Sequence, residues 1–94
     1  MVKPDAQIAA LDVAIFNNKK ITKKLTLSEK AVLARISAFE KAGEAESTQS
    51  MANFLGMGKP SVQRLIRNLK ARDFVRIAKV NDRLRIYVVN EEKL

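Results

Sequence analysis

The basic side chains of this sequence are concentrated in one segment, Lys59 to Arg85. That segment holds nine basic and two acidic residues, a net charge of +7, whereas all 94 residues together carry +8. A charged surface that only keeps a protein in solution usually mixes the two signs. A segment with one sign of charge is typical of proteins that bind a polyanion. We therefore expect these side chains to pair with phosphate groups.

The residue types needed for catalysis and metal binding are scarce. The sequence has no histidine and no cysteine, which removes the commonest general base and the thiolate metal ligands. Glu40, Glu44 and Glu46 are candidates for a carboxylate pair or a hard-metal site, but no partner motif accompanies them. Gly58-Lys59 is followed by proline, so it does not make a phosphate loop. We expect no enzymatic activity, no metal and no cofactor.

Two helices are predicted before the basic segment. Thr26-Leu27-Ser28-Glu29 is a capping box, and the helix that it begins ends at Ala42-Gly43. After an acidic loop or short strand, Ser47 caps a second helix, Thr48 to Leu55. Its inward residues are predicted to be Met51, Phe54 and Leu55. The run Gly56-Met57-Gly58 ends this helix.

A third helix, from Lys59 or Pro60 to about Arg72, is strongly amphipathic. Its apolar positions recur at i, i+3, i+4 and i+7, namely Val62, Leu65, Ile66 and Leu69. The opposite side carries Pro60, Arg64, Arg67 and Ala71, flanked by Gln63 and Asn68. Lys70 and Arg72 are expected to meet a phosphate backbone or solvent. The helix therefore has one apolar side and one hydrogen-bonding side.

The remaining elements flank these three helices. Asp5 to Phe16 is predicted as a short helix, followed by a polar break and an extended basic connector, Ile21 to Leu25. After Arg72 the period changes from 3.6 to 2, and Phe74 to Val80 and Leu84 to Asn90 predict a β-hairpin. Tyr87 is expected to pack within it.

The fold class predicted is α+β and mostly helical: a three-helix core with a C-terminal hairpin and an extra N-terminal helix. Residues 1–24 form the N-terminal helix and connector, residues 25–90 the main domain, and residues 91–94 a frayed tail. No apolar run approaches the length of a membrane span, and no signal peptide is visible. We expect a cytoplasmic, nucleoid-associated protein.

The stretch STQSMANFLGMGKPSVQRLIRNLKARDFV carries a family resemblance. Ser47 matches a helix cap, Ala52 the small residue at a helix crossing, Gly56 the turn position and Met57 its apolar plug. The stretch resembles the winged helix-turn-helix superfamily, most closely the MarR-like bacterial regulators, and the resemblance extends from about Leu25 to Val89, two thirds of the chain. Those regulators are longer and have helices at both ends that build a dimer and an effector cleft. We therefore expect no small-molecule ligand here.

The resemblance implies sequence-specific binding to double-stranded DNA by a transcriptional regulator of a bacterium, phage or plasmid. The third helix is then the recognition helix in the major groove, and the hairpin is the wing on the backbone or minor groove. Recognition-helix contacts are expected from Lys59, Pro60, Ser61, Gln63, Arg64, Arg67 and Asn68. Wing contacts are expected from Lys79, Asn81, Arg83 and Arg85. Weaker backbone contacts are expected from Lys23, Lys24, Ser47, Thr48 and Lys70.

A homodimer is expected, with the N-terminal helix as the candidate interface. Its apolar residues are Ile8, Leu11 and Ile15. The alternative is that this helix folds back onto the core of its own chain. A dimer would place two recognition helices ~34 Å apart and require a palindromic site.

Other functions remain open. Replication or partition control on a plasmid or phage would use the same residues. A winged helix can also serve as a protein-interaction adaptor, although an adaptor does not require the +7 segment. Structured RNA ranks last, because a helix does not enter the narrow major groove of an A-form duplex.

Overall fold

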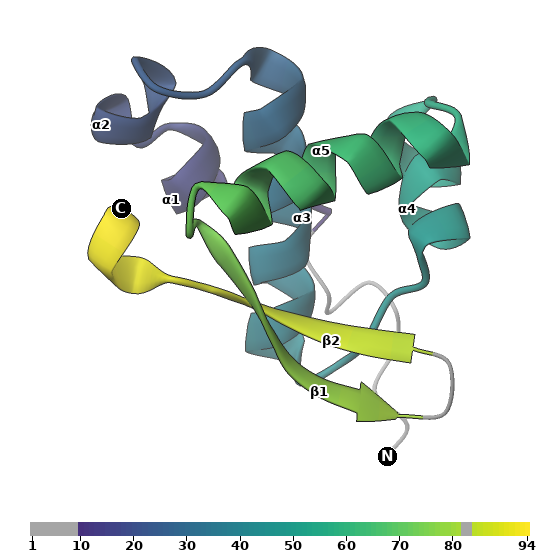
Figure 1. Cartoon of the computed structure of the whole chain (residues 1–94). Coiled ribbons are helices and arrows are strands. Elements are labelled where there is room, and N and C mark those ends of the chain that lie inside the picture. The colour runs from purple at the N-terminus through teal and green to yellow at the C-terminus, as the bar shows by residue number, and fades with distance from the viewer. Residues whose placement is uncertain (1–9, 82–83) are drawn as a thin grey trace.

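The computed structural model describes residues 10–81 and 84–94, apart from the side chains of residues 79–81, 84 and 85. Within these residues the chain forms five α-helices and one two-stranded antiparallel sheet, followed by a 3-10 turn. The elements are α1 (Val13–Phe16), α2 (Lys19–Thr22), α3 (Leu27–Ala42), α4 (Thr48–Leu55), α5 (Lys59–Ala71), β1 (Val75–Asn81), β2 (Leu84–Val89) and the turn Glu91–Lys93. In Figure 1, α5 crosses α3, and α4 lies at the N-terminal end of α5. The β1–β2 hairpin lies below α5 in this view. The predicted α+β, mostly helical class is confirmed.

The predicted helix caps of α3 and α4 are confirmed. The Thr26 hydroxyl accepts from the amide of Glu29 at 3.2 Å, and the Glu29 carboxylate accepts from the amide of Thr26 at 2.8 Å. Such a reciprocal pair satisfies amides that have no partner within the helix. Gly43 ends α3 in the left-handed conformation with φ 71°, and the Ser47 hydroxyl accepts from the amide of Ser50 at the start of α4.

A short turn joins α4 to α5 and fixes their crossing. Gly56 ends α4 with φ 68°, where a residue with a Cβ is strained. The Met57 amide then donates to the carbonyl of Ala52 at 3.0 Å, and Ala52 itself is fully buried. Pro60 occupies the first turn of α5, where its missing amide breaks no hydrogen bond.

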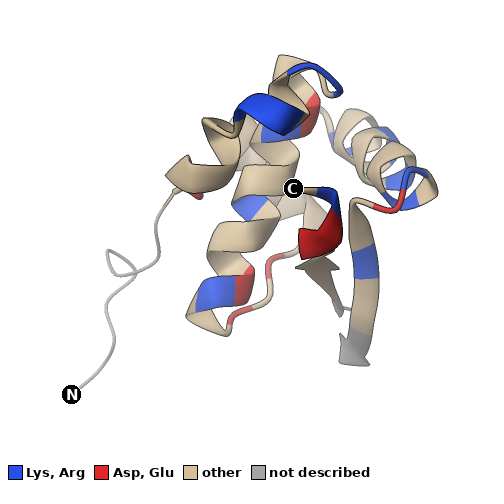
Figure 2. Ribbon diagram, turned by 90° about the vertical axis from the view of Figure 1, so that its left-hand side faces the viewer, with Lys and Arg blue, Asp and Glu red and all other residues tan. Residues whose placement is uncertain are grey.

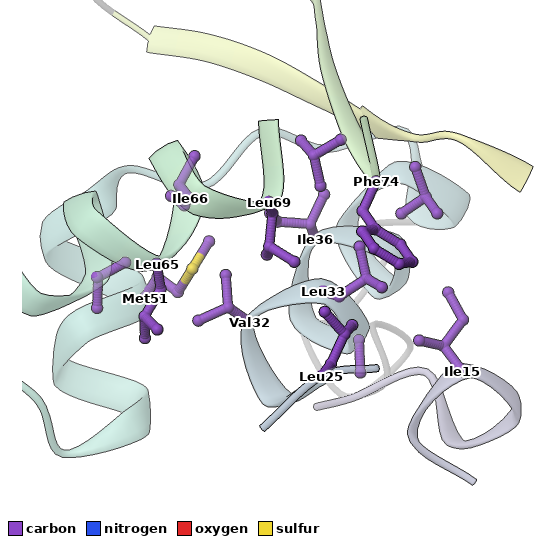
Figure 3. Packing of buried hydrophobic residues seen from close by; sticks show 14 of the residues in the cluster. Ile15, Leu25, Val32, Leu33, Ile36, Met51, Leu65, Ile66, Leu69 and Phe74 are labelled. Atoms are coloured by element: carbon purple, nitrogen blue, oxygen red, sulfur yellow. The ribbon is translucent and has the colours of Figure 1, made fainter. Parts of the chain in front are cut away.

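The apolar side of α5 supplies much of the core. Val62, Leu65, Ile66 and Leu69 are all buried, as the sequence predicts. Leu65, Ile66 and Leu69 of α5 belong to the same buried cluster as Val32 and Leu33 of α3, which Figure 3 shows from close by. Burying this side directs the opposite side of α5 outward, because the helix has only one apolar stripe.

The N-terminal helix is shorter than predicted. The prediction of a helix from Asp5 to Phe16 is wrong over residues 10–12, because α1 begins only after Asp12. The Asp12 carboxylate accepts from the amide of Ala14 at 3.1 Å and so acts as the N-cap. Ile8 and the rest of residues 1–9 lie outside the described residues.

The predicted extended connector, Ile21 to Leu25, is also wrong. Residues 19–22 form α2, whose N-cap is Asn18: its side chain accepts from the amides of Lys20 and Ile21. Ile21 is fully buried and Leu25 is 6% exposed. The core therefore extends across the predicted boundary at residue 24.

The predicted hairpin is confirmed, with one irregularity. Val75 pairs with Val89 and Ile77 with Tyr87, but Lys79 then pairs with Ile86, so Ala78 forms a β-bulge. The Val89 amide donates to the carboxylate of Glu40 at 2.9 Å, which ties β2 to α3. Tyr87 packs against the core, as predicted.

The predicted frayed tail is wrong as well. Residues 91–93 form a 3-10 turn that Asn90 caps, and Leu94 packs against the core. The Asn90 amide group also donates to the carbonyl of Asp73 at 2.9 Å. The C-terminal residues therefore close one end of the hairpin.

Phe54 does not point into the core as predicted, because Arg35 holds it at the surface. Its side chain is 45% exposed, and the Arg35 guanidinium lies 3.8 Å from the centre of its ring. The same guanidinium lies 4.6 Å from the ring of Phe39 and pairs with both carboxylate oxygens of Glu46, at 2.7 and 2.9 Å. Cation–π stacking and a bidentate ion pair thus link α3 to α4.

Candidate functional site

The outward side of α5 is open to solvent along its length. Because α5 buries its apolar stripe, the residues opposite that stripe must face away from the core. Ser61 is half-buried, and the other predicted contact residues of α5 are exposed: Lys59, Pro60, Gln63, Arg64, Arg67 and Asn68. The structure therefore brings these seven residues together on one helix.

The cations of α5 differ from Arg35, Arg72 and Arg76 in having no partner within the described part of the chain. Arg35 pairs with Glu46, Arg72 with Glu29 and Arg76 with Asp73. Among the described residues, no side-chain hydrogen bond or ion pair involves Arg64 or Arg67. The same is true of Lys59 and Lys70 within the described ranges. These cations are thus available to an anion from outside the chain.

No acidic residue belongs to α5 itself, and Asp73 follows two residues after its end. Figure 2 shows the acidic segments on α3, on the loops that follow α3 and α5, and at the C-terminal turn. The outward side of α5 therefore has an unneutralised positive charge, which favours a polyanion.

Arg72 is 43% exposed, as the predicted position in solvent requires, but its guanidinium also makes a structural contact. Its guanidinium donates to the carbonyl of Lys24 at 2.8 Å and lies 3.9 Å from the Glu29 carboxylate. Arg72 therefore ties the C-terminal end of α5 to the turn before α3.

A depression of about 260 Å³ lies between α4, α5 and β2. Gln63, Arg67 and Lys70 form its α5 wall, together with Ile66 beneath them. Thr48 contributes from the first turn of α4, and Tyr87 from β2. Tyr87 was predicted only as a packing residue. Its position at this depression depends on the register of the hairpin, which the sequence does not reveal.

The predicted hairpin contacts are described only in part. Lys79, Asn81 and Arg85 lie in β1 and β2, near the tip, but their side chains are outside the description. Arg83 lies outside the described residues altogether. The structure therefore gives the course of the backbone in this region but not the positions of its cations.

The weaker predicted backbone contacts fall in two places. Thr48 and Lys70 line the depression, whereas Lys23 and Lys24 are exposed in the turn after α2. The Ser47 hydroxyl is engaged as the cap of α4. Thr48 and Lys70 thus join the residues of α5, while Lys23 and Lys24 lie on a separate element.

Two of the three predicted dimer residues, Leu11 and Ile15, contribute to the core of their own chain, and Ile8 lies outside the described residues. Ile15 is 5% exposed, and Leu11 is half-buried against the same core. Val13, between them, is 66% exposed. Within the described residues, α1 therefore folds back onto α3, which is the alternative that the sequence left open.

Of the three acidic residues considered for catalysis, two make structural contacts and the third lines a small cavity. Glu40 accepts from the amide of Val89, and Glu46 pairs with Arg35. Glu44 lines a cavity of about 20 Å³ beside them. Over residues 10–81 and 84–94, no group of three potential ligands is arranged to hold a metal ion, and no helix is long and apolar enough to cross a bilayer.

Two carboxylates have shifted pKa values for reasons of local contact. Burial raises the pKa of Asp12, but hydrogen bonds from Lys41 and Ser37 outweigh it and hold the pKa below its ordinary value. The hydrogen bond from Arg76 lowers the pKa of Asp73. Both groups stabilise turns, and neither lines the depression.

No protein-family model matches this chain, and neither a curated protein nor a solved structure matches it. The features that bear on function are therefore the exposed cations of α5, the depression beside them and the elements that position both.

Proposed function

We propose that this chain binds double-stranded DNA in a sequence-specific manner as a winged helix-turn-helix protein. In this proposal α5 is the recognition helix and the β1–β2 hairpin is the wing. The observation that carries the proposal is the exposure of Arg64 and Arg67 without an internal partner. An α-helix fits the major groove, which is ~12 Å wide. Arg side chains there can pair with guanine, and Gln63 and Asn68 can pair with adenine.

The arrangement around α5 supports this proposal. The left-handed Gly56 and the buried Ala52 allow α4 and α5 to cross closely. The core side of α5 is fixed by Leu65 and Leu69, and its C-terminal end by Arg72. A helix held at both ends presents its outward side chains with little loss of conformational entropy on binding.

Regulation of transcription is the role we propose for this binding, in the cytoplasm of a bacterium or for a phage or plasmid. Control of replication or partition would use the same surface. A homodimer on a palindromic site is part of the proposal, but Leu11 and Ile15 are occupied within their own chain. Such a dimer would therefore use other residues, such as the exposed Val13.

The proposal is tested by selecting bound sequences from a random duplex pool and measuring affinity for selected and random duplexes by fluorescence anisotropy. Arg64→Ala or Arg67→Ala should reduce the preference for the selected duplex by ~1–3 kcal/mol each, because a bidentate base contact is lost. Lys79→Ala or Arg83→Ala should weaken binding to both duplexes similarly, because phosphate contacts carry no direct sequence information. Lys93→Gln, which removes one charge from the C-terminal turn, is the control and should change little.

Salt dependence separates DNA binding from the adaptor function. The logarithm of affinity should fall with the logarithm of salt concentration by ~0.9 for each phosphate neutralised. Absence of binding at low salt, or a flat response, would favour a protein-interaction adaptor. Equal losses on both duplexes for Arg64→Ala, Arg67→Ala, Lys79→Ala and Arg83→Ala would contradict the assigned roles.

A further inference from the structure

The depression between α4, α5 and β2 has a lining suited to an anion. Arg67 and Lys70 contribute two cations, and none of the lining residues that the structure describes is acidic. Thr48, Gln63 and Tyr87 contribute hydroxyl and amide groups that can donate hydrogen bonds. A polar lining of this kind favours a charged group over an apolar ligand.

The hydroxyl donors of this depression have no partner within the described part of the chain. Among the residues that the structure describes, the Tyr87 hydroxyl has no hydrogen-bond partner, and neither does the Thr48 hydroxyl. Tyr87 packs against the core and also lines the depression, so its side chain is held beside the site by the fold. Thr48 is the first residue of α4, where backbone amides lack partners within the helix.

We infer that this depression binds a single phosphate group. Arg67 and Lys70 supply the ion pairs, and the side chains of Thr48, Gln63 and Tyr87 donate hydrogen bonds to the phosphate oxygens. The volume of about 260 Å³ lies below the usual range for drug-sized ligands, which suits a small, strongly hydrated group. Three separate elements supply the donors, so the site exists only in the folded chain.

Two sources can supply this phosphate. A backbone phosphate of bound DNA reaches the depression only if the DNA binding proposed above holds. A free phosphate monoester reaches it in either case. Because Gln63 and Arg67 belong to both the depression and the outward side of α5, a free phosphate bound there would compete with DNA.

The first experiment titrates the full chain with inorganic phosphate at constant ionic strength, followed by amide NMR, with chloride as the reference anion. We expect saturable shifts at Thr48, Gln63 and Tyr87. Lys70→Gln should weaken phosphate binding about tenfold, and Tyr87→Phe about threefold to tenfold, because each removes one hydrogen bond to a charged ligand. Arg64→Gln removes the same charge as Lys70→Gln from the same helix but outside the depression, and should leave phosphate binding unchanged.

The second experiment measures the salt dependence of duplex binding for the same variants. If a DNA phosphate enters the depression, Lys70→Gln should lower the slope by ~0.9 without changing the ratio of selected to random affinity. Saturable phosphate binding with an unchanged slope assigns the site to a free phosphate monoester. If phosphate acts like chloride and the slope is unchanged, the phosphate site is wrong while DNA binding stands. Saturable phosphate binding without any duplex binding would instead reject the proposed function and keep the site.

Discussion

At the scale of single residues, the polar groups of this chain divide into those that hold the fold and those that face solvent. Asp12 belongs to the first group: it is 8% exposed and caps α1. Its other oxygen accepts from the Ser37 hydroxyl and from the Lys41 ammonium, both at 2.6 Å. Arg67 belongs to the second, with no such partner in the described part of the chain. A sequence lists both as charged residues, and only the fold distinguishes them.

The contacts of Asp12 predict a loss of stability in acid. Hydrogen bonds from Lys41 and Ser37 hold its folded pKa below the unfolded value of about 4, despite its burial. The stabilisation is therefore complete above about pH 4 and is lost as pH falls through the lower folded pKa. Asp12→Asn keeps the helix cap but removes the charge, and should lower the free energy of unfolding by ~1–3 kcal/mol at pH 7.

Urea denaturation of both proteins from pH 7 to pH 2 measures this difference. The gap between wild type and Asp12→Asn should narrow as the pH falls, because protonation removes the charge from the wild type too. Asp73→Asn is the control: Asp73 also has a lowered pKa, but its side chain is half-exposed, so the loss at pH 7 should be smaller. A constant gap between wild type and Asp12→Asn over the whole range would contradict the role of the charge.

At the scale of elements, the α4–α5 turn contains two glycines with different functions. Gly56 has φ 68°, and nothing lies within 4 Å of a Cβ added there. Gly58 precedes α5 with φ −73° and supplies no side-chain cap to that helix. Only Gly56 therefore needs the backbone freedom of glycine.

Opposite effects on stability follow for the two positions. Gly56→Ala should lower the free energy of unfolding by ~1–2 kcal/mol, since the cost is left-handed backbone strain without a steric clash. Gly56→Asn should cost less, because Asn tolerates that conformation. Gly58→Ser should raise stability by ~0.5 kcal/mol, because serine can cap α5 and also restricts the unfolded chain. Thermal denaturation of the three variants measures these effects, and destabilisation by Gly58→Ser would contradict the cap assignment.

Long elements with strong end signals were predictable from the sequence, and short ones were not. The capping box at Thr26 and the apolar stripe of α5 defined α3 and α5 to within about one residue. The four residues of α2 are too few to show a helical period, and Asn18, which caps them in the structure, lay in the predicted polar break. Phe54 was predicted inward because helix period does not reveal the stacking on Arg35.

The candidate site was predictable to the same extent as the helix that carries it. The outward position of Arg64 and Arg67 follows from the stripe on the other side of α5. The position of Tyr87 at the depression depends on the hairpin register, and a bulge at Ala78 changes that register. Pairing of Arg72 with the Lys24 carbonyl joins residues 48 positions apart, which no local pattern indicates.

At the scale of the whole molecule, the small N-terminal helices share one core with the rest of the chain. Ile15, Ile21 and Leu25 pack in the same apolar cluster as Leu69 and Phe74. Asp12 and Arg72 add polar ties from this region to α3 and α5. We therefore expect the described part of the chain to unfold as one cooperative unit, although the sequence suggested a boundary at residue 24.

Ile21→Ala tests this cooperativity. Ile21 is fully buried although it lies in a helix of four residues, so its loss should lower the free energy of unfolding by ~2–4 kcal/mol, as for a core position. Leu69→Ala, at an equally buried position of α5, should cost a similar amount, whereas Lys20→Ala, exposed beside Ile21, should change stability by less than ~0.5 kcal/mol. Circular dichroism reports the helices, and the fluorescence of Tyr87, the single tyrosine of a chain without tryptophan, reports the hairpin. Both signals should shift together in Ile21→Ala, because the hairpin and α2 pack on the same core; a tyrosine transition unmoved by the substitution would show that the N-terminal helices form a separate unit.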